Sequence, residues 1–374
     1  MLYFDNNATT NIDEQVLSVY YGALKNNYGN AGSTYSYGVK SKQLILAARE
    51  QIAKLLNAPV ENIVFTSCAT ESNNAIISSC ISSAPTKKHI ITTSVEHPSV
   101  LNPLHELEKH GCELDLLSVD RCGRLDLTEL STKLRTDTAL VSIMQVNNEI
   151  GNIYPIKKAV DIVKAFDPNI PFHTDAVQAI GKIKVDVADL GVDFLSFSGH
   201  KFHAPKGIGG FYVKEPQKFK PLLFGGKQEF GLRSGTEDVP SIVAIGKAAS
   251  IINVDAEVST ISVLRAKIER AVTMMYPGTE ILGDLENRVC NTTNLLIPDV
   301  NAVTLVASLG ELGVCISSGS ACSEKGKGQS HVLTAMGFEN KSIRVSLSRF
   351  TTKEEVQRFI AILLQTIKKM QTKE

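Results

Sequence analysis

The feature that most constrains the fold is an alternation of short apolar runs with helical segments through the first two thirds of the chain. The apolar runs have the length of buried strands and are rich in β-branched residues; they are 62–67, 89–95, 113–119, 139–146, 171–175 and 193–198. Segments with amphipathic helical spacing lie between several of them, at 70–82, 98–110, 126–134 and 154–166. This alternation predicts an α/β fold with a mostly parallel sheet covered on both faces.

The pattern changes after the apolar run 211–213, at a glycine-rich stretch over 225–235. A helix from about 258 to 275 follows, and then shorter helices and strands over 289–297, 302–312, 315–317, 343–348 and 353–370. This order predicts a smaller α+β domain. With 374 residues, 43% of them hydrophobic, the chain is too long for one compact core and apolar enough for two.

Composition excludes several classes of function. Lys+Arg and Asp+Glu both number 39, so no overall basic field exists to hold nucleic acid or an acidic membrane surface. Tryptophan is absent and 6% of residues are aromatic, which argues against a base-stacking surface. Acidic residues stand near the N-terminus where a targeting signal would carry basic ones, and no window approaches the ~20 apolar residues of a membrane span. We therefore expect a soluble, cytoplasmic protein.

Seven cysteines are present, with no CxxC pair. Since a disulfide framework is not typical of a chain this long and zinc-ligand spacing is missing, we expect reduced thiols and no intrinsic metal site. Cys322 stands apart because it lies in a small polar loop, SSGSACS, whereas Cys80 and Cys315 have apolar neighbours. Cys322 is the best candidate for an accessible nucleophilic thiol, with a bystander surface thiol as the alternative.

Reactive side chains follow two of the predicted strands, and ligands of an open parallel sheet bind beyond the carboxyl ends of its strands. Lys201 follows 193–198 in SGHKFHAPKG, where a lysine can form a Schiff base with an aldehyde cofactor. The alternatives are a solvated loop lysine and a metal pair of His200 and His203, which the charge of Lys201 disfavours. Asp175 ends another strand, where a carboxylate can hold a protonated ring nitrogen or a metal, or cap the next helix.

Three further strand ends carry weaker signals. SCATES leaves the first N–H groups of a helix open for a phosphate, unless Ser67 or Thr70 caps them. His97 precedes a helix and can stack on a flat aromatic ligand or serve as a cap. Asn147 and Asn148 favour a turn, with ligand binding as the sharper alternative. No P-loop, HExxH or GxSxG motif is present.

Taken together, these motifs resemble those of the pyridoxal-phosphate-dependent cysteine desulfurases of the NifS/IscS type, in the class-V aminotransferase family. The resemblance runs nearly end to end, through YFDNNATT, TSCATESNN, SVEHPSV, VNNEIG, TDAVQ, SGHKFHAPKGIG, GLRSGTE, SSGSACS, SHVLTAMG and IRVSLSRFT. It implies fold type I in a homodimer. A large domain over 14–255 would bind pyridoxal phosphate, and a small domain over 1–13 and 256–374 would carry the active-site cysteine loop.

The resemblance also implies which residues hold the cofactor ring. Lys201 matches the lysine that binds the cofactor aldehyde, and Asp175 matches the aspartate paired with the pyridine nitrogen. Gln178 and Asn148 match the contacts to the ring hydroxyl, and His97 matches the histidine stacked on the ring.

Further matches concern the phosphate and the substrate. The phosphate cup corresponds to Ala69, Thr70, Ser198, Gly199 and His200. Thr236 resembles a phosphate ligand donated by the neighbouring subunit. Arg344, with Asn148 beside it, matches the arginine that binds the substrate carboxylate.

The activity implied is the conversion of L-cysteine to L-alanine. Lys201 would move the α-proton, and His97 would exchange a proton with the substrate thiol. Cys322 would take the sulfur as a persulfide and could serve as a transient iron–sulfur ligand. The sulfur would pass to an acceptor protein, either an iron–sulfur scaffold or a tRNA-thiolation enzyme.

Two other functions compete with this one: a selenocysteine lyase or aminotransferase-like lyase of the same cofactor class, and a non-catalytic sulfur carrier or scaffold. Cys322 favours the desulfurase over the first, and the trio of Lys201, Asp175 and His97 argues against the second. The chain departs from the family's usual motifs at Ala31, Gly32 and Tyr35, on the expected entrance wall of the site, and at Lys227 and Phe230.

Overall fold

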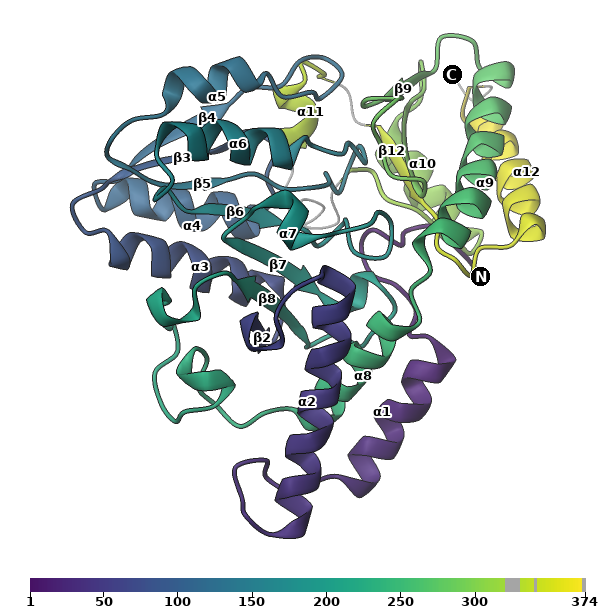
Figure 1. Ribbon diagram of the computed structural model, residues 1–374. Coiled ribbons are helices and arrows are strands. Elements are labelled where there is room, and N and C mark those ends of the chain that lie inside the picture. Colours follow the sequence, from purple (N-terminus) through teal and green to yellow (C-terminus); the bar gives the residue numbers. More distant parts are fainter. Residues whose placement is uncertain (320–329, 340–341, 372–374) are drawn as a thin grey trace.

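The computed structural model describes residues 1–319, 330–339 and 342–371, and its centre is a seven-stranded sheet (Figure 1). Across the sheet the strands are β2 (Ile63–Thr66), β8 (Gly209–Val213), β7 (Phe194–Ser198), β6 (Phe172–Asp175), β5 (Thr138–Ser142), β3 (His89–Thr93) and β4 (Glu113–Leu117). Within this sheet only β8 runs antiparallel to its neighbours. The carboxyl ends of the other strands therefore meet at one edge, and the predicted mostly parallel α/β sheet is confirmed.

Helices cover both faces of the sheet. Successive strand residues point to opposite sides, so buried apolar runs present side chains to both faces. Ile90 and Leu140 pack in one apolar cluster with α3 and α4, whereas Ile91 and Val141 pack in another with α5, α6 and α8. The helices of this part are α1 (Glu14–Asn26), α2 (Ser36–Leu56), α3 (Ala69–Ser83), α4 (Pro98–Lys109), α5 (Leu127–Lys133), α6 (Ile156–Phe166), α7 (Val187–Leu190) and α8 (Val239–Ser250). Short 3₁₀ turns are η1 (Val60–Asn62), η2 (Gly199–Lys201), η3 (Pro216–Lys218) and η4 (Glu229–Gly231).

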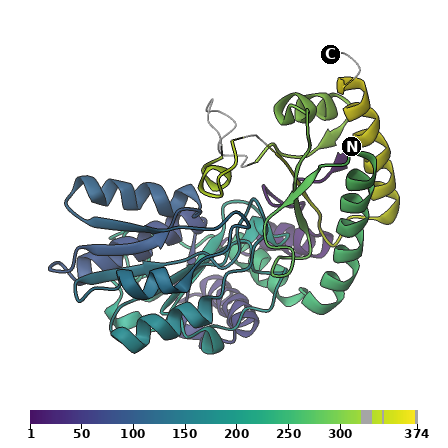
Figure 2. The same cartoon turned by 90° about the horizontal axis from the view of Figure 1, so that it is seen from above.

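A second layered unit lies beside the first (Figure 2). Its antiparallel sheet has the order β12 (Ile343–Ser346), β10 (Thr292–Leu296) and β9 (Glu280–Leu282). It shares an apolar cluster with α9 (Val254–Met275), α10 (Ala302–Glu311) and α12 (Lys353–Gln371). The N-terminal strand β1 (Leu2–Tyr3) pairs with β11 (Val314–Cys315) in this unit, while α11 (His331–Ala335) packs on the large sheet's cluster.

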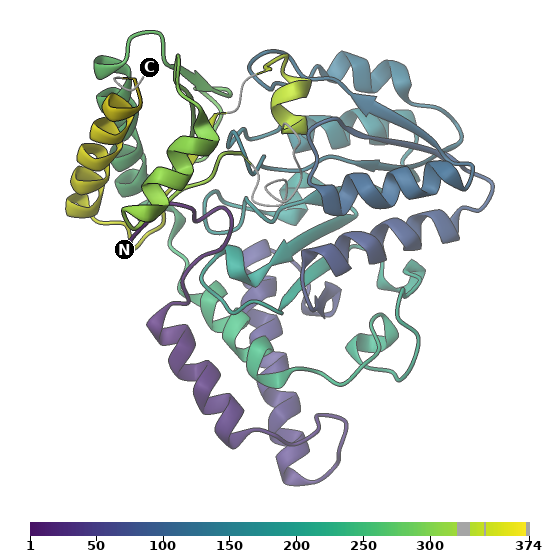
Figure 3. The same ribbon diagram turned by 180° about the vertical axis from the view of Figure 1, so that it is seen from behind.

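The apolar runs locate the sheet well but miss several helices. The hairpin of α1 and α2, which packs on α8, has no counterpart in the pattern analysis (Figures 1 and 3). The reason lies in the buried residues of α2, which include Gly38, Ser41 and Arg49 and so break the expected apolar stripe. Within the described ranges no single helix could cross a membrane by length and apolarity; only α8 and α9 pass that test together, as a pair bent by 77°.

Candidate active site

The carboxyl ends of the parallel strands open on a cavity of about 260 Å³. Ten of the residues singled out from the sequence lie on its wall: Ala69, Thr70, His97, Asn148, Asp175, Gln178, Ser198, His200, Lys201 and Arg344. They come from five strand ends of the large sheet and from β12 of the smaller unit. Residues far apart in the sequence are thus brought to one place, as expected for the edge of a parallel sheet.

Lys201 ends η2, the turn that directly follows β7. Its Nζ donates hydrogen bonds to the backbone oxygens of Asn7, at 2.6 Å, and Ala8, at 2.9 Å. Gly199 does not line the cavity, and a Cβ atom there would lie only 3.0 Å from the Cβ of Ala204. Gly199 therefore allows the close packing that orients the lysine.

Asp175 is buried at the end of β6 and is held by two hydrogen bonds. Its Oδ1 accepts from the backbone N–H of Val177 at 2.9 Å, and its Oδ2 accepts from Asn73 Nδ2 at 3.0 Å. The first bond closes a turn, and the next helix, α7, is capped by Asp186, so the helix-capping alternative for Asp175 is wrong. Within the described part of the chain Asp175 has no cation within ion-pair distance. Its carboxylate can therefore accept a further N–H from a group in the cavity.

His97 caps the N-terminus of α4 and also lines the cavity, so the capping interpretation is confirmed. Its Nδ1 accepts the backbone N–H of Ser99 at 3.1 Å and contacts Ser99 Oγ at 2.8 Å. Burial lowers the pKa of His97, and the charges of Lys201 and His331 lower it further, against the opposing charge of Asp175. Since Nδ1 accepts an N–H, the neutral ring carries its proton on Nε2.

A hydrogen-bonded chain joins these two groups. Asn73 Nδ2 donates to Ser99 Oγ at 2.9 Å as well as to Asp175, so that His97, Ser99, Asn73 and Asp175 form one connected set. Neither Asn73 nor Ser99 was singled out from the sequence. Asn73 lies inside a helix, where an asparagine is ordinarily a surface residue, but here it is fully buried. The burial of Asn73, which marks it as a site residue, can be recognised only from the fold.

The first turn of α3 forms another wall of the cavity, at Ala69 and Thr70. The cap residue is Cys68, and its side chain makes no capping hydrogen bond, so the alternative of a cap by Ser67 or Thr70 is wrong. The fifteen-residue helix thus presents open N–H groups and the positive end of its dipole to the cavity, an arrangement that suits a phosphate.

The histidines after β7 do not form a metal pair. His200 Nδ1 contacts Thr9 Oγ1 at 3.1 Å, and His203 Nδ1 contacts the backbone oxygen of Asn11 at 2.9 Å. Burial, reinforced by the charges of Lys201 and Lys206, lowers the pKa of His200 to about 4, so this ring is neutral. Among the described residues no group of three His, Cys, Asp or Glu side chains is placed to hold a metal ion.

Arg344 reaches the cavity from β12, with a side chain that is 1% exposed. Its Nη2 donates to Asp5 Oδ1 at 2.6 Å, and its Nη1 donates to the backbone oxygen of Asn148 at 3.0 Å. Its Nε is buried and has no hydrogen-bond partner among the described residues. An unpaired donor on a buried arginine is costly, and a carboxylate in the cavity would satisfy it.

Two of the predicted residues that the structure describes do not line this cavity: Gly199 and Thr236. Thr236 is exposed and does not line the cavity of its own chain. Cys322 lies outside the described residues. Asn7, in contrast, lines the cavity without having been singled out as a site residue. The DNN triplet near the N-terminus was its only sequence signal.

Comparison with known proteins gives consistent matches. The family model described as "Aminotransferase class-V" matches residues 2–359. A cysteine desulfurase of Nostoc sp. (strain PCC 7120 / SAG 25.82 / UTEX 2576) is 43% identical over 376 residues, covering 99% of this chain and 94% of the relative.

Two solved structures extend the match to the fold. A NifS-like protein superposes with a TM-score of 0.93 at 37% identity, covering 98% of this chain and 99% of the other. A structure described as SspA in complex with cysteine superposes with a TM-score of 0.83 at 34% identity, covering 94% of this chain and 100% of the other.

Proposed function

The chain belongs to the class-V aminotransferase family and is a pyridoxal-phosphate-dependent cysteine desulfurase, and on this premise we propose which of its residues carry out the reaction. Its fold is type I, its cofactor is pyridoxal phosphate and its substrate is L-cysteine. When bound, pyridoxal phosphate withdraws electrons from the α-carbon of the substrate.

The residues on the cavity wall fit this cofactor. The uncapped N-terminus of α3 suits its phosphate, and Ser198 and His200 line the same cavity, joined by Gly199 in the chain. Asp175 has a lone pair for the pyridine nitrogen, since the two hydrogen bonds of its carboxylate come from Val177 and Asn73. Gln178 and Asn148 are placed for the ring hydroxyl.

We assign the proton transfers to Lys201 and His97. Lys201 is held by two backbone carbonyls and takes the α-proton of the substrate. His97 is neutral with its proton on Nε2, as its bonds to Ser99 require, so it can exchange a proton with the substrate thiol at that atom. The set of Ser99, Asn73 and Asp175 keeps the ring in place.

Arg344 orients the substrate. Its Nε, which is buried and has no partner in the part of the chain that the structure describes, donates to the substrate carboxylate. Asp5 and the backbone of Asn148 fix its other two nitrogens. A planar guanidinium held on two sides presents its Nε–H in one direction. This contact determines which way the sulfur of L-cysteine points.

The sulfur acceptor in this proposal is Cys322. Its thiolate attacks the substrate sulfur and forms an S–S bond. The carbon–sulfur bond breaks, its electron pair stays with the carbon skeleton, and protonation of that carbon gives L-alanine. The persulfide then supplies an acceptor protein, an iron–sulfur scaffold or a tRNA-thiolation enzyme.

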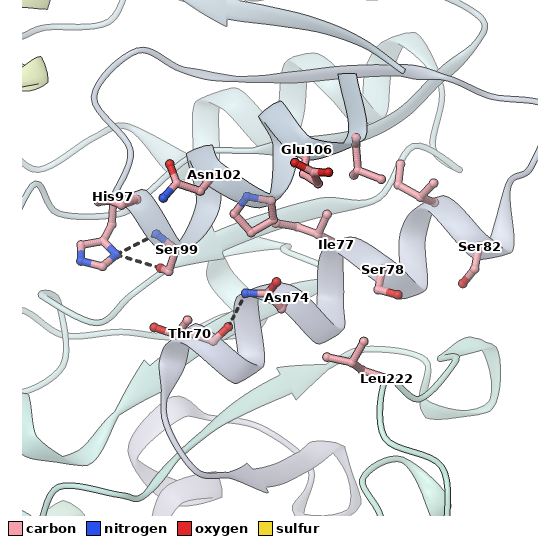
Figure 4. Close-up of a pocket in the computed structure, with 14 residues that line it drawn as sticks. Thr70, Asn74, Ile77, Ser78, Ser82, His97, Ser99, Asn102, Glu106 and Leu222 are labelled. Atoms are coloured by element: carbon pink, nitrogen blue, oxygen red, sulfur yellow. Dashed lines mark hydrogen bonds between the residues drawn. The ribbon is translucent and has the colours of Figure 1, made fainter. Parts of the chain in front are cut away.

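We also propose a homodimer. A groove of about 810 Å³ between α3 and α4 begins at Thr70 and His97, beside the cavity, and is lined by apolar side chains such as Leu222 (Figure 4). A second copy would cover this groove and bring its exposed Thr236 to the phosphate. The division into a large domain over 14–255 and a small one over 1–13 and 256–374 is supported by the second apolar cluster, which joins Leu2 and Phe4 to residues between 261 and 367. Residues 282, 289 and 332–338 depart from this division, because their apolar side chains belong to the cluster of the large sheet.

A cytoplasmic location is the further part of this proposal. The six cysteines within the described residues are all free thiols, and a reducing compartment keeps thiols in that state.

The observation that carries the proposal is the convergence of Lys201, Asp175, His97 and Arg344 on one cavity. The test measures alanine and sulfide released from L-cysteine, with pyridoxal phosphate and a thiol reductant present. We expect the unaltered enzyme to release equal amounts of alanine and sulfide. Lys201→Ala should lack the absorption band of a lysine-bound aldehyde. Cys322→Ala should keep that band but form no persulfide. Undiminished sulfide release by Cys322→Ala would refute its role, and bound cofactor without alanine would favour selenocysteine as substrate.

A further inference from the structure

A second lysine, Lys182, lies behind Lys201. The chain leaves β6 in a helical turn, with the N–H of Ile180 bonded to the oxygen of Ala176 and the N–H of Lys182 bonded to that of Ala179. This turn places Lys182 four residues after Gln178 and on the same side. Lys182 is 8% exposed, and within the described residues no carboxylate lies within ion-pair distance of it. Burying a charged amine without a counter-ion is costly, so we ask what the buried Lys182 amine does.

Neutral oxygens hold the Lys182 amine in place. Its Nζ donates to Gln178 Oε1 and, at 3.3 Å, to Asn7 Oδ1. The backbone oxygen of the same Asn7 accepts from Lys201 Nζ. Asn7 therefore bridges the two amines, one on its side chain and one on its main chain.

The two amines are also close in space. Both lysines line one small cavity of about 30 Å³, and Lys201 lines the main cavity as well. Burial is the largest cause that lowers the pKa of Lys182, to about 7, and repulsion by Lys201 is the next. Repulsion between two amines acts equally on both, so a proton on Lys182 opposes a proton on Lys201.

The other charged and titratable groups around Lys182 do not cancel this effect. Arg344 and His203 interact with it, and Arg349 lines the same small cavity. Cys290 opposes the shift of the Lys182 pKa, and Glu257, which also lines the small cavity, is bound to Arg349. Glu257 is thus bound to another cation, and among the charges that act on Lys182 that of Lys201 has the largest effect.

We propose that Lys182 is a positioning residue that acts through Lys201: a second amine, held behind it by Asn7 and Gln178, repels a proton on the Lys201 nitrogen and keeps that nitrogen ready to take the α-proton of the substrate. A lysine base needs such a neighbour or desolvation to be unprotonated near neutral pH. The inference rests on the role proposed above for Lys201.

The test titrates the visible absorption of the bound cofactor with pH in the holoenzyme. In Lys182→Met the repelling charge is gone, so the midpoint of the absorption change should move up by about one pH unit. Lys182→Arg keeps the charge and should restore the original midpoint. Lys184→Met, which removes an exposed lysine two residues away, is the matched control and should change nothing. The acid limb of kcat should move with the midpoint, while KM for L-cysteine stays within about twofold.

The outcomes separate the two proposals. If Lys182→Met binds cofactor and its midpoint stays at that of the unaltered enzyme, the inference about Lys182 is overturned. If Lys182→Met fails to fold, Lys182→Gln, which keeps polar contacts without the charge, must show the upward shift, and an unmoved midpoint there overturns the inference equally. If Lys201→Ala retains the titrating absorption, the role of Lys201 itself fails instead.

Discussion

Asn7 holds together segments that are far apart along the chain. Its Nδ2 donates to Thr292 Oγ1 at 2.8 Å and to the backbone oxygen of Asn148 at 3.1 Å, and its Oδ1 accepts from Asn291 and Lys182. These bonds join the N-terminal segment to both layered units. Because the side chain is buried, each partner depends on it for a hydrogen bond.

We predict that Asn7→Ala destabilises the protein by about 3 kcal/mol, since several buried polar groups lose a partner and each costs on the order of 1–3 kcal/mol. Urea denaturation of the cofactor-free chain measures this loss. Asn11→Ala, at an exposed position of the same segment, is the control and should cost under about 0.5 kcal/mol. Equal stability of the two variants would contradict the assignment.

Glu96 stands next to His97 and is fully buried. Its Oε1 accepts from the backbone N–H of Met144 and from Thr93 Oγ1, both at 2.8 Å, while its Oε2 has no partner within residues 1–319, 330–339 and 342–371. Burial raises the pKa of Glu96 to about 8. Between pH 4.5 and 8 the folded state therefore keeps a proton on Glu96 that the unfolded state releases. As the pH rises through this window, the free energy of unfolding decreases.

Glu96→Gln should remove this pH dependence of stability, because glutamine mimics the protonated acid and keeps the bonds to Oε1. We expect the free energy of unfolding of the variant to fall less between pH 5 and pH 8 than that of the unaltered protein, by up to about 1.4 kcal/mol per pH unit. Urea denaturation at the two pH values, with the exposed Glu61→Gln as control, measures the difference. Parallel pH profiles would show that Glu96 is ionised in the folded state.

At the scale of elements, α2 fixes the glycine-rich stretch that carries η4. Arg49 of α2 binds Glu229 through two bonds of 2.6 and 2.7 Å, and both side chains are buried. The Arg49 guanidinium also lies over the rings of Phe65 and Phe230, at 4.8 and 4.9 Å. Glu229 and Phe230 have positive φ angles of 47° and 60°, a conformation that this pair of contacts stabilises.

We expect Arg49→Met to cost about 3–5 kcal/mol, because it leaves the carboxylate of Glu229 buried without its cation. The double variant Arg49→Met, Glu229→Gln should recover part of this loss, since the uncompensated charge is removed. Lys54→Met, on the exposed side of α2, serves as the control in the same urea titration. No recovery in the double variant would mean that packing, and not charge, determines the loss.

Apolar periodicity predicted the elements that are buried as strands or amphipathic helices, and β2, α3 and α4 lie within three residues of the expected ranges. It did not predict elements whose buried residues are small or polar, such as α2 with Arg49. The site follows the same division. Lys201 and Asp175 stand at strand ends and can be found by topology, whereas Asn73 and Lys182 become part of the site only through burial.

At the scale of the whole molecule, the cavity is built from both layered units and, in the proposed dimer, from two chains. Arg344 comes from the small antiparallel sheet, while Lys201 and Asp175 come from the large one. Their relative position depends on Asn7 and on the bonds of Arg344 to Asp5 and Asn148. The proposed contribution of Thr236 from the second chain can be separated from these contacts, because Thr236 is exposed and does not line the cavity of its own chain.

Mixed dimers provide the sharpest test of shared sites. Lys201→Ala removes the amine from a chain's own cavity, whereas Thr236→Glu places a negative charge against the phosphate of the neighbouring one. Each homodimer should therefore be inactive. In a dimer of one chain of each kind, one cavity has both defects and the other has Lys201 from one chain and Thr236 from its partner. A statistical 1:1 mixture should then regain about a quarter of the full alanine release, since half of the dimers are mixed and each has one intact site of two.

The controls follow from the same arithmetic. Lys201 and Asp175 line the cavity of the same chain. In a mixed dimer of Lys201→Ala and Asp175→Ala each cavity therefore keeps one of the two defects, and alanine release should stay absent. Loss of activity in Thr236→Glu that the mixed dimer does not restore would place Thr236 in its own chain's site. Restoration in the first mixture and none in the second requires a second chain at the phosphate, since no arrangement within one chain can combine an intact Lys201 with a Thr236 from elsewhere.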